Sequence, residues 1–78
     1  MDKDNLFPQF RKLSNEKAFY KIIDELNFEE IQLVGSKKLF YQTYAEQYLE
    51  ILRIQDMLNC IDGLFIIISE KEWSELNN

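Results

Sequence analysis

The sequence contains no histidine and a single cysteine, Cys60. Histidine is the commonest general base and metal ligand near neutral pH, so the usual catalytic and zinc-binding arrangements are excluded. A structural zinc ion needs four Cys or His ligands, and an intramolecular disulfide needs two cysteines. The acidic pairs fall on stretches expected to be solvated, where nothing would raise a carboxyl pKa. We therefore expect no metal, no cofactor and no catalysis, and we interpret Cys60 as a buried structural thiol.

Positive charge and long apolar runs are also scarce. Nine basic residues against fourteen acidic ones give a net charge of −5. This balance repels phosphate groups, so we expect neither nucleic acid nor an anionic membrane surface as a partner. The longest apolar run, Leu64 to Ile68, is too short to span a bilayer. The lone cysteine and the absence of a signal-peptide pattern predict a cytoplasmic protein.

Glycine and proline are rare, with two and one copies, and the chain shows no repeat and no linker. We expect a single domain over residues 1–78, with residues 1–5 frayed. A chain of this size buries only about 60–65% of the surface that its unfolded form exposes. Without a disulfide or a metal, its stability must come from dense apolar packing or from a partner chain. The composition supports dense packing, since 46% of the residues are hydrophobic and 14% aromatic.

The most organised stretch that is present runs from Lys37 to Cys60. Its residues separate on a helical wheel with the 3.6-residue period of an amphipathic helix. We predict a long central helix that is capped by Ser36 and ends at Asp62-Gly63. The apolar half of its first part consists of Phe40, Tyr41, Tyr44, Ala45, Tyr48, Leu49, Ile51 and Leu52. Past Arg53 the apolar positions, which include Ile54 and Met57, rotate away from this stripe, so we expect the helix to bend or its last turns to contact a different surface.

Four other segments complete the expected fold. We predict helices over residues 6–13 and 15–26, strands over 28–34 and 64–68, and a short C-terminal helix opened by Ser69. The predicted fold class is α+β and predominantly helical, in the order α-α-β-α-β-α. A small sheet of two parallel strands would pack on the central amphipathic helix. The five consecutive apolar residues at 64–68 predict a strand that is fully buried. An all-α small helical bundle is the alternative, because a 4-3-4-3 apolar spacing continues through Gly63.

Another arrangement of the middle of the chain is a β-hairpin over residues 28–44, turning at Gly35-Ser36. Pairing its two arms places apolar residues on both faces of the ribbon. It also breaks the helical pattern that begins at Phe40. For these two reasons we reject the hairpin.

Aromatic residues are the main candidates for a functional surface. Tyr41, Tyr44 and Tyr48 would share one helix face, which is either core or interface, because tyrosine tolerates water at one end. An incomplete sheet or the central helix could also pair with a second copy in a homodimer. The candidate interface residues are Tyr41, Tyr44, Tyr48, Ile54, Met57 and Trp73. The leading hypothesis is an acidic, non-catalytic protein that binds another protein, as an inhibitor, adaptor or immunity-type factor.

The segment NFEEIQLVGSKKLFYQTY, residues 27–44, resembles a helix-turn-helix of bacterial regulators. Val34-Gly35-Ser36 would be the turn, and Lys37-Lys38 would open the recognition helix. The resemblance implies a DNA-binding regulator, which is the alternative function.

Overall fold

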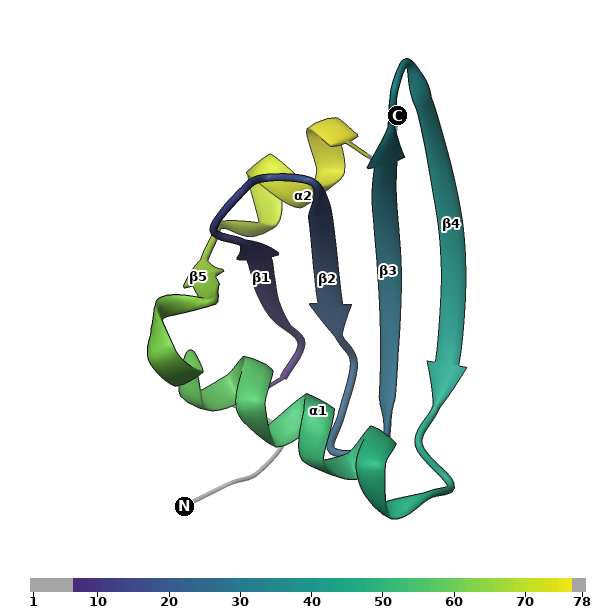
Figure 1. Cartoon of the computed structure of the whole chain (residues 1–78), viewed down its shortest axis with the longest axis vertical. Coiled ribbons are helices and arrows are strands. Elements are labelled where there is room, and N and C mark those ends of the chain that lie inside the picture. The colour runs from purple at the N-terminus through teal and green to yellow at the C-terminus, as the bar shows by residue number, and fades with distance from the viewer. Residues whose placement is uncertain (1–6, 77–78) are drawn as a thin grey trace.

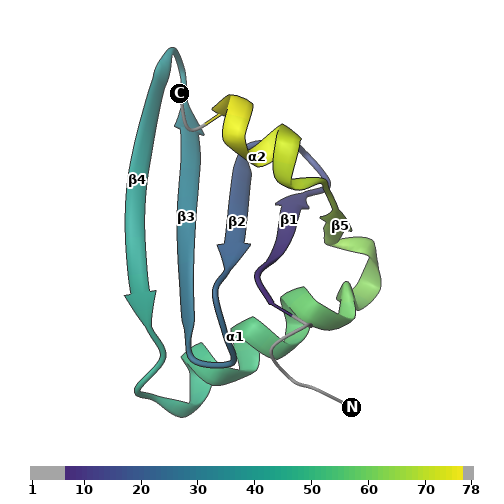
Figure 2. The same cartoon turned by 180° about the vertical axis from the view of Figure 1, so that it is seen from behind.

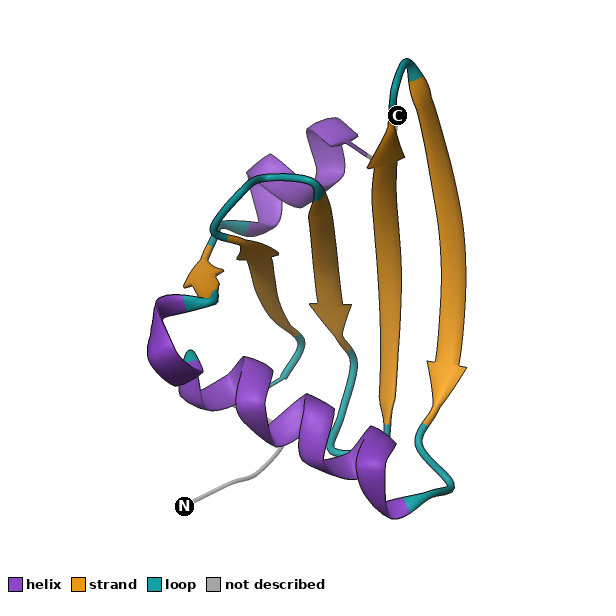
Figure 3. Cartoon of the chain, viewed as in Figure 1, coloured by secondary structure: helices purple, strands orange, loops and turns teal. Residues whose placement is uncertain are grey.

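The structure, a computed structural model, describes residues 7–76, so the fraying expected for residues 1–5 lies outside the described residues. Five strands form one antiparallel sheet in the order β4-β3-β2-β1-β5 (Figure 1). The elements are β1 (Gln9–Leu13), β2 (Ala18–Ile22), β3 (Asn27–Val34), β4 (Lys37–Tyr44), α1 (Tyr48–Asn59), a 3-10 turn (Ile61–Gly63), β5 (Phe65–Ile67) and α2 (Glu70–Leu76). Strands hold 41% of the described residues and helices 31% (Figure 3). Both the predominantly helical α+β fold and the all-α bundle are therefore wrong.

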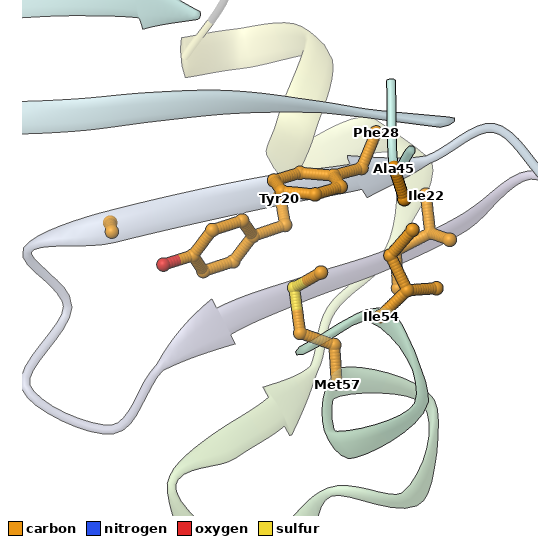
Figure 4. Close-up of a cluster of buried hydrophobic side chains, with 7 residues drawn as sticks. Tyr20, Ile22, Phe28, Ala45, Ile54 and Met57 are labelled. Carbon is orange, nitrogen blue, oxygen red and sulfur yellow. The ribbon is translucent and has the colours of Figure 1, made fainter. Parts of the chain in front are cut away.

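The two helices cover opposite faces of the sheet, as Figures 1 and 2 show from the two sides. The core under α1 contains Ala18, Tyr20, Ile22, Phe28, Ala45, Ile54 and Met57 (Figure 4). The core under α2 contains Phe10, Phe19, Ile31, Ile68 and Trp73. Successive residues of a strand point to opposite faces, so a sheet covered on both sides needs apolar residues at consecutive positions.

This two-sided burial explains why the helix expected over residues 15–26 is wrong. Phe19 packs under α2, whereas its neighbours Ala18 and Tyr20 pack under α1. Their consecutive burial, together with Ile22, imitated the stripe of an amphipathic helix. The same reason overturns the helix expected over residues 6–13, whose described part contains β1.

The rejected β-hairpin is present. β3 and β4 pair from Val34 opposite Lys37 to Asn27 opposite Tyr44, and the turn is Gly35-Ser36. Gly35 has φ +62°, a left-handed conformation that glycine adopts at little steric cost. Residues 37–44 are thus a strand, and the helix-turn-helix resemblance is not reflected in the fold. Apolar residues on both faces were no objection, because β3 is covered on both sides.

The central helix is shorter than expected and begins at Tyr48. Glu50 Oε1 accepts a hydrogen bond from the Gln47 backbone N–H at 3.3 Å, which stabilises its first turn. Its last turn rests on Arg11, a buried residue of β1. Arg11 Nε donates to the Met57 carbonyl oxygen at 3.0 Å, and Nη2 donates to that of Leu58 at 3.3 Å. The end of a helix leaves carbonyls short of donors. Arg11 supplies a donor to that of Leu58 and a second one to that of Met57, which also accepts from the Cys60 N–H at 3.3 Å.

The C-terminal elements lie where they were expected but pair differently. β5 forms within residues 64–68 and pairs with β1, antiparallel, instead of forming a parallel pair with the strand at 28–34. It is an edge strand whose Ile67 is exposed, so the expectation of a fully buried strand is wrong. The short helix after Ser69 is confirmed as α2, and the Ser69 hydroxyl oxygen accepts a hydrogen bond from the Glu72 N–H at 3.1 Å.

Candidate protein-binding edge

The candidate site is the outer edge of β4. This strand is eight residues long, and within the described chain it pairs only with β3. In Figure 1, α1 crosses the lower end of the sheet and α2 lies behind the upper part of β1 and β2, while the tip of the β3–β4 hairpin extends beyond the neighbouring strands. The large apolar side chains of β4 are exposed, Phe40 by 58% and Tyr44 by 62%.

The register fixes which backbone groups of β4 point outward. The Ala45 N–H donates to the Leu26 carbonyl oxygen at 2.7 Å, so it points toward β3. In an antiparallel ladder this direction alternates along the strand. The N–H and C=O groups that point away from β3 are therefore those of Lys38, Phe40, Gln42 and Tyr44. They form a row of donors and acceptors that an additional strand could use.

The side chains of β4 divide between the two faces of the sheet. Tyr41 lies opposite Glu30, and Leu39 lies opposite Gln32, on the side of α1. Phe40 lies opposite Ile31, on the side of α2. There it borders a groove of about 340 Å³ whose lining also includes Trp73 and Gln42. An added strand would find apolar contacts on both faces.

Beyond its first two residues, β4 lacks the features that normally protect an edge strand. Residues 39–45, LFYQTYA, carry no charge and no proline. The pairing with β3 continues without a bulge through all eight residues. Proteins usually shield such edges with charges, proline, bulges or short strands. Here only Lys37 and Lys38, next to the turn, place charge on the strand.

A polar cluster holds α1 beside this edge. Arg53 Nη2 donates to the Tyr20 hydroxyl at 3.2 Å and lies 3.5 Å from Glu30 Oε2. Its guanidinium also stacks over the rings of Tyr20 and Phe28, 5.6 and 5.5 Å from their centroids. Burial raises the pKa of Tyr20, and the nearby Glu30 carboxylate raises it further. Because Gln32 Nε2 also donates to Glu30, at 2.9 Å, the buried carboxylate is well partnered, and we assign this cluster a structural role.

The structure separates the six candidate interface residues into two groups. Tyr41 and Tyr44 lie on β4, on opposite faces of the sheet, and Tyr48 begins α1 with 72% of its surface exposed. Ile54 and Met57 are completely buried in the core under α1 (Figure 4). Trp73 is the buried residue of α2 and faces the sheet, with its ring centroid 6.2 Å from that of Phe10. The three tyrosines thus lie on the surface, whereas the other three residues lie in the core.

Sequence reasoning missed two apolar residues of this surface. Phe40 was placed on the buried side of a helix, and Leu49 likewise, yet Leu49 is 76% exposed. A signal was available in residues 39–44, because leucine, aromatic residues and threonine without charge or glycine favour a strand. That signal could not show that β4 lies at the edge of the sheet, because the position of a strand depends on the order of all the strands.

Comparisons of the chain with protein-family models, with curated proteins and with solved structures found no significant match. Within residues 7–76, no cluster of three or more Cys, Asp or Glu side chains is arranged to hold a metal ion. None of the helices in that range has the length and apolar character needed to cross a membrane. We therefore infer the function from the β4 edge.

Proposed function

We propose that this is a non-catalytic, cytoplasmic binding protein that accepts an extended segment of another protein as an additional strand along β4. The observation that carries the proposal is the unprotected eight-residue edge described above. This activity suits a small acidic regulator, such as an inhibitor, an adaptor or an immunity-type factor.

Strand addition uses main-chain hydrogen bonds for affinity and side-chain contacts for selectivity. The outward groups of Lys38, Phe40, Gln42 and Tyr44 supply the main-chain bonds, each worth about 0.5–1.5 kcal/mol net. Side chains of the added strand would alternate between the faces. On one face they would meet Phe40 and the groove beside Trp73, and on the other Leu39 and Tyr41. The preferred segment is therefore extended, apolar at alternate positions and uncharged at its centre.

The test begins with peptides displayed from the proteome of the source organism and selected on the immobilised protein. Binding of the selected peptides is then measured to the wild type, to Gln42→Pro and to Gln42→Ala. Proline removes an outward N–H and leaves the bonds to β3 in place, whereas alanine removes only the side chain. We expect Gln42→Pro to weaken binding at least about tenfold, and Gln42→Ala to leave it nearly unchanged.

Amide hydrogen exchange shows where the peptide binds. The N–H groups of Phe40, Gln42 and Tyr44 should become protected in the complex, whereas those of Tyr41 and Thr43 should already be protected in the free protein. Equal binding to Gln42→Pro, protection confined to the helices, or failure to select any peptide would contradict the proposal.

A further inference from the structure

We infer that in the free protein the β4 edge is covered by β4 of a second copy, antiparallel and related by a two-fold axis, and that this dimer must open before another strand can be added. The inference rests on the proposed function, because it assigns a resting occupant to the same edge. It makes the binding of a partner depend on the concentration of the protein itself.

The charges around β4 favour its own copy in one orientation. Lys37 and Lys38 lie at the start of the strand, and Glu46 and Glu50 follow its end. Antiparallel pairing of two copies sets the basic end of each beside the acidic end of the other. Parallel pairing would place the lysines of both copies together, where opposed like charges are destabilising.

The outward backbone groups also favour one register. Outward-pointing residues must meet outward-pointing residues for the ladder to form. With Tyr41 on the two-fold axis, Phe40 meets Gln42 of the second copy and Lys38 meets its Tyr44, so all four outward residues are paired in both chains. The same register leaves Glu46 of the second copy diagonally beyond Tyr44, on the side of Lys38, whose Nζ also donates to the Leu76 carbonyl oxygen of its own chain at 2.8 Å.

This register places side chains favourably on both faces. The two Tyr41 rings meet at the axis on the side of α1, and Leu39 meets Thr43 of the second copy. On the side of α2, Phe40 lies diagonally across from its counterpart, at the distance where aromatic side chains still make contact. The Gly35-Ser36 turn of one copy comes beside the start of α1 of the other, where Tyr48 and Leu49 are exposed.

The other edge of the sheet explains why this pairing closes. β5 is only three residues long, so it offers little to a neighbouring strand. Pairing β4 of one copy with β5 of the next would always leave a free β4 at one end of the assembly and a free β5 at the other, and would therefore produce open filaments. Pairing β4 with β4 consumes both long edges at once and gives a closed dimer, with a ten-stranded sheet that ends in β5 on either side.

Sedimentation equilibrium tests the dimer, since one chain has a mass of 9.4 kDa. We expect twice that mass for the wild type and for Gln42→Ala, and one chain for Gln42→Pro. Circular dichroism of Gln42→Pro confirms that it is folded. A wild type that remains at one chain up to its solubility limit would overturn the inference. The peptide measurements above would still decide the proposed function, so the two failures are distinguishable.

Two further variants test orientation and register. Lys38→Glu should weaken the dimer at least about tenfold, and adding Glu46→Lys to the same chain should restore it, because the two charges are exchanged across the antiparallel pair.

In a Cys60→Ser background, Tyr41→Cys should form a disulfide-linked dimer on mild oxidation, since a non-hydrogen-bonded pair places two Cα atoms close together. Thr43→Cys, the matched control, should not. No rescue by Glu46→Lys, or equal cross-linking by both cysteines, would overturn the assigned pairing.

A last measurement links the dimer to its proposed regulation. A peptide selected on the protein should convert the dimer into a complex of one chain and one peptide, and its apparent affinity should fall as the protein concentration rises. A complex that retains two chains with the peptide bound at β4 would overturn mutual exclusion.

Discussion

Arg11 and Met57 are joined by a buried hydrogen bond across 46 residues of chain, from the guanidinium Nε to a carbonyl oxygen 3.0 Å away. The same guanidinium donates from Nη1 to the carbonyl oxygen of Phe10, at 2.8 Å. A charged side chain inside so small a protein is tolerable only because these carbonyls surround it. Arg11 therefore joins the first strand to the end of α1.

Replacing Arg11 should test this connection. Arg11→Met keeps much of the volume but removes the guanidinium donor from the Leu58 carbonyl oxygen and one of two donors from that of Met57, which keeps the Cys60 N–H at 3.3 Å. Because a buried polar group that loses its partner costs about 1–3 kcal/mol, we expect a loss of about 1–3 kcal/mol in the free energy of unfolding. Urea denaturation measures it. Lys17→Met, at an exposed position, is the control and should change stability by less than about 0.5 kcal/mol.

The burial of Met57 and the exposure of Tyr48 can be tested as a pair on one helix. Met57→Ala should cost about 2–5 kcal/mol, since it opens a cavity in the core under α1. Tyr48→Ala should change the free energy of unfolding by less than about 0.5 kcal/mol. Thermal and urea unfolding of both variants provide the comparison. Similar losses at the two positions would contradict the placement of α1.

Tyr20 makes stability depend on pH on the alkaline side. Burial raises its pKa above the ordinary 10.0 of the unfolded chain. The folded state then retains a proton that the unfolded state loses. The contribution of the Tyr20 proton to the free energy of unfolding is fully present below pH 10. It is lost as the pH rises from there through the pKa of Tyr20 in the folded protein. Urea midpoints between pH 8 and 11 should fall more steeply for the wild type than for Tyr20→Phe; parallel curves would refute the assignment.

The turn of the hairpin should respond to substitution through its backbone alone. A Cβ atom at Gly35 would meet nothing within 4 Å, so a side chain fits, but φ is +62°. Gly35→Ala should therefore cost about 1 kcal/mol, the penalty of a left-handed conformation for a residue with a side chain. Ser36→Ala is the neighbouring control. A loss much larger than that would indicate contacts at the tip that the structure does not contain.

Nucleic-acid binding offers a test of the charge argument. With a net charge of −5 and no basic run longer than Lys37-Lys38, the protein has too few phosphate contacts for useful affinity. We expect no mobility shift of duplex DNA at about 150 mM salt. A shift in the micromolar range that disappears in Lys37→Glu/Lys38→Glu would support the alternative function.

Elements with a local signal in the sequence were predicted better than those whose pattern depends on burial. The strand at 28–34 and the helix after Ser69 were found because each has a local signal, an alternation and a cap. Residues 18–22 and 37–44 were misread as helices for two different reasons. In β2, burial from both sides hides the period of two. In β4, aromatic residues are exposed on both faces, so their spacing reports neither burial nor period.

The candidate site was foreseen only in part for the same reason. Tyr41, Tyr44 and Tyr48 were selected for their chemistry, and each lies on the surface. Ile54 and Met57 were selected because their apolar positions rotate away from the tyrosine stripe of a continuous helix. The helix in the structure, α1, begins at Tyr48, so Ile54 and Met57 do not share a helix with Tyr41 and Tyr44. Their angular offset from those tyrosines on a helical wheel therefore had no physical meaning. Trp73 covers the sheet instead of extending toward solvent. The direction of its side chain depends on how α2 packs against the sheet, which the sequence of a short helix does not indicate.

The connection between the two ends of the chain also affects how the protein emerges during synthesis. β1 is made first, yet one of its two neighbours is β5, made near the end, as the bond from the Ser14 N–H to the Leu64 carbonyl oxygen shows. On the ribosome, the first four strands can form their meander while the guanidinium of Arg11 still lacks Met57 and Leu58. Until residues 57–68 leave the exit tunnel, the nascent chain thus exposes a second edge, that of the five-residue β1.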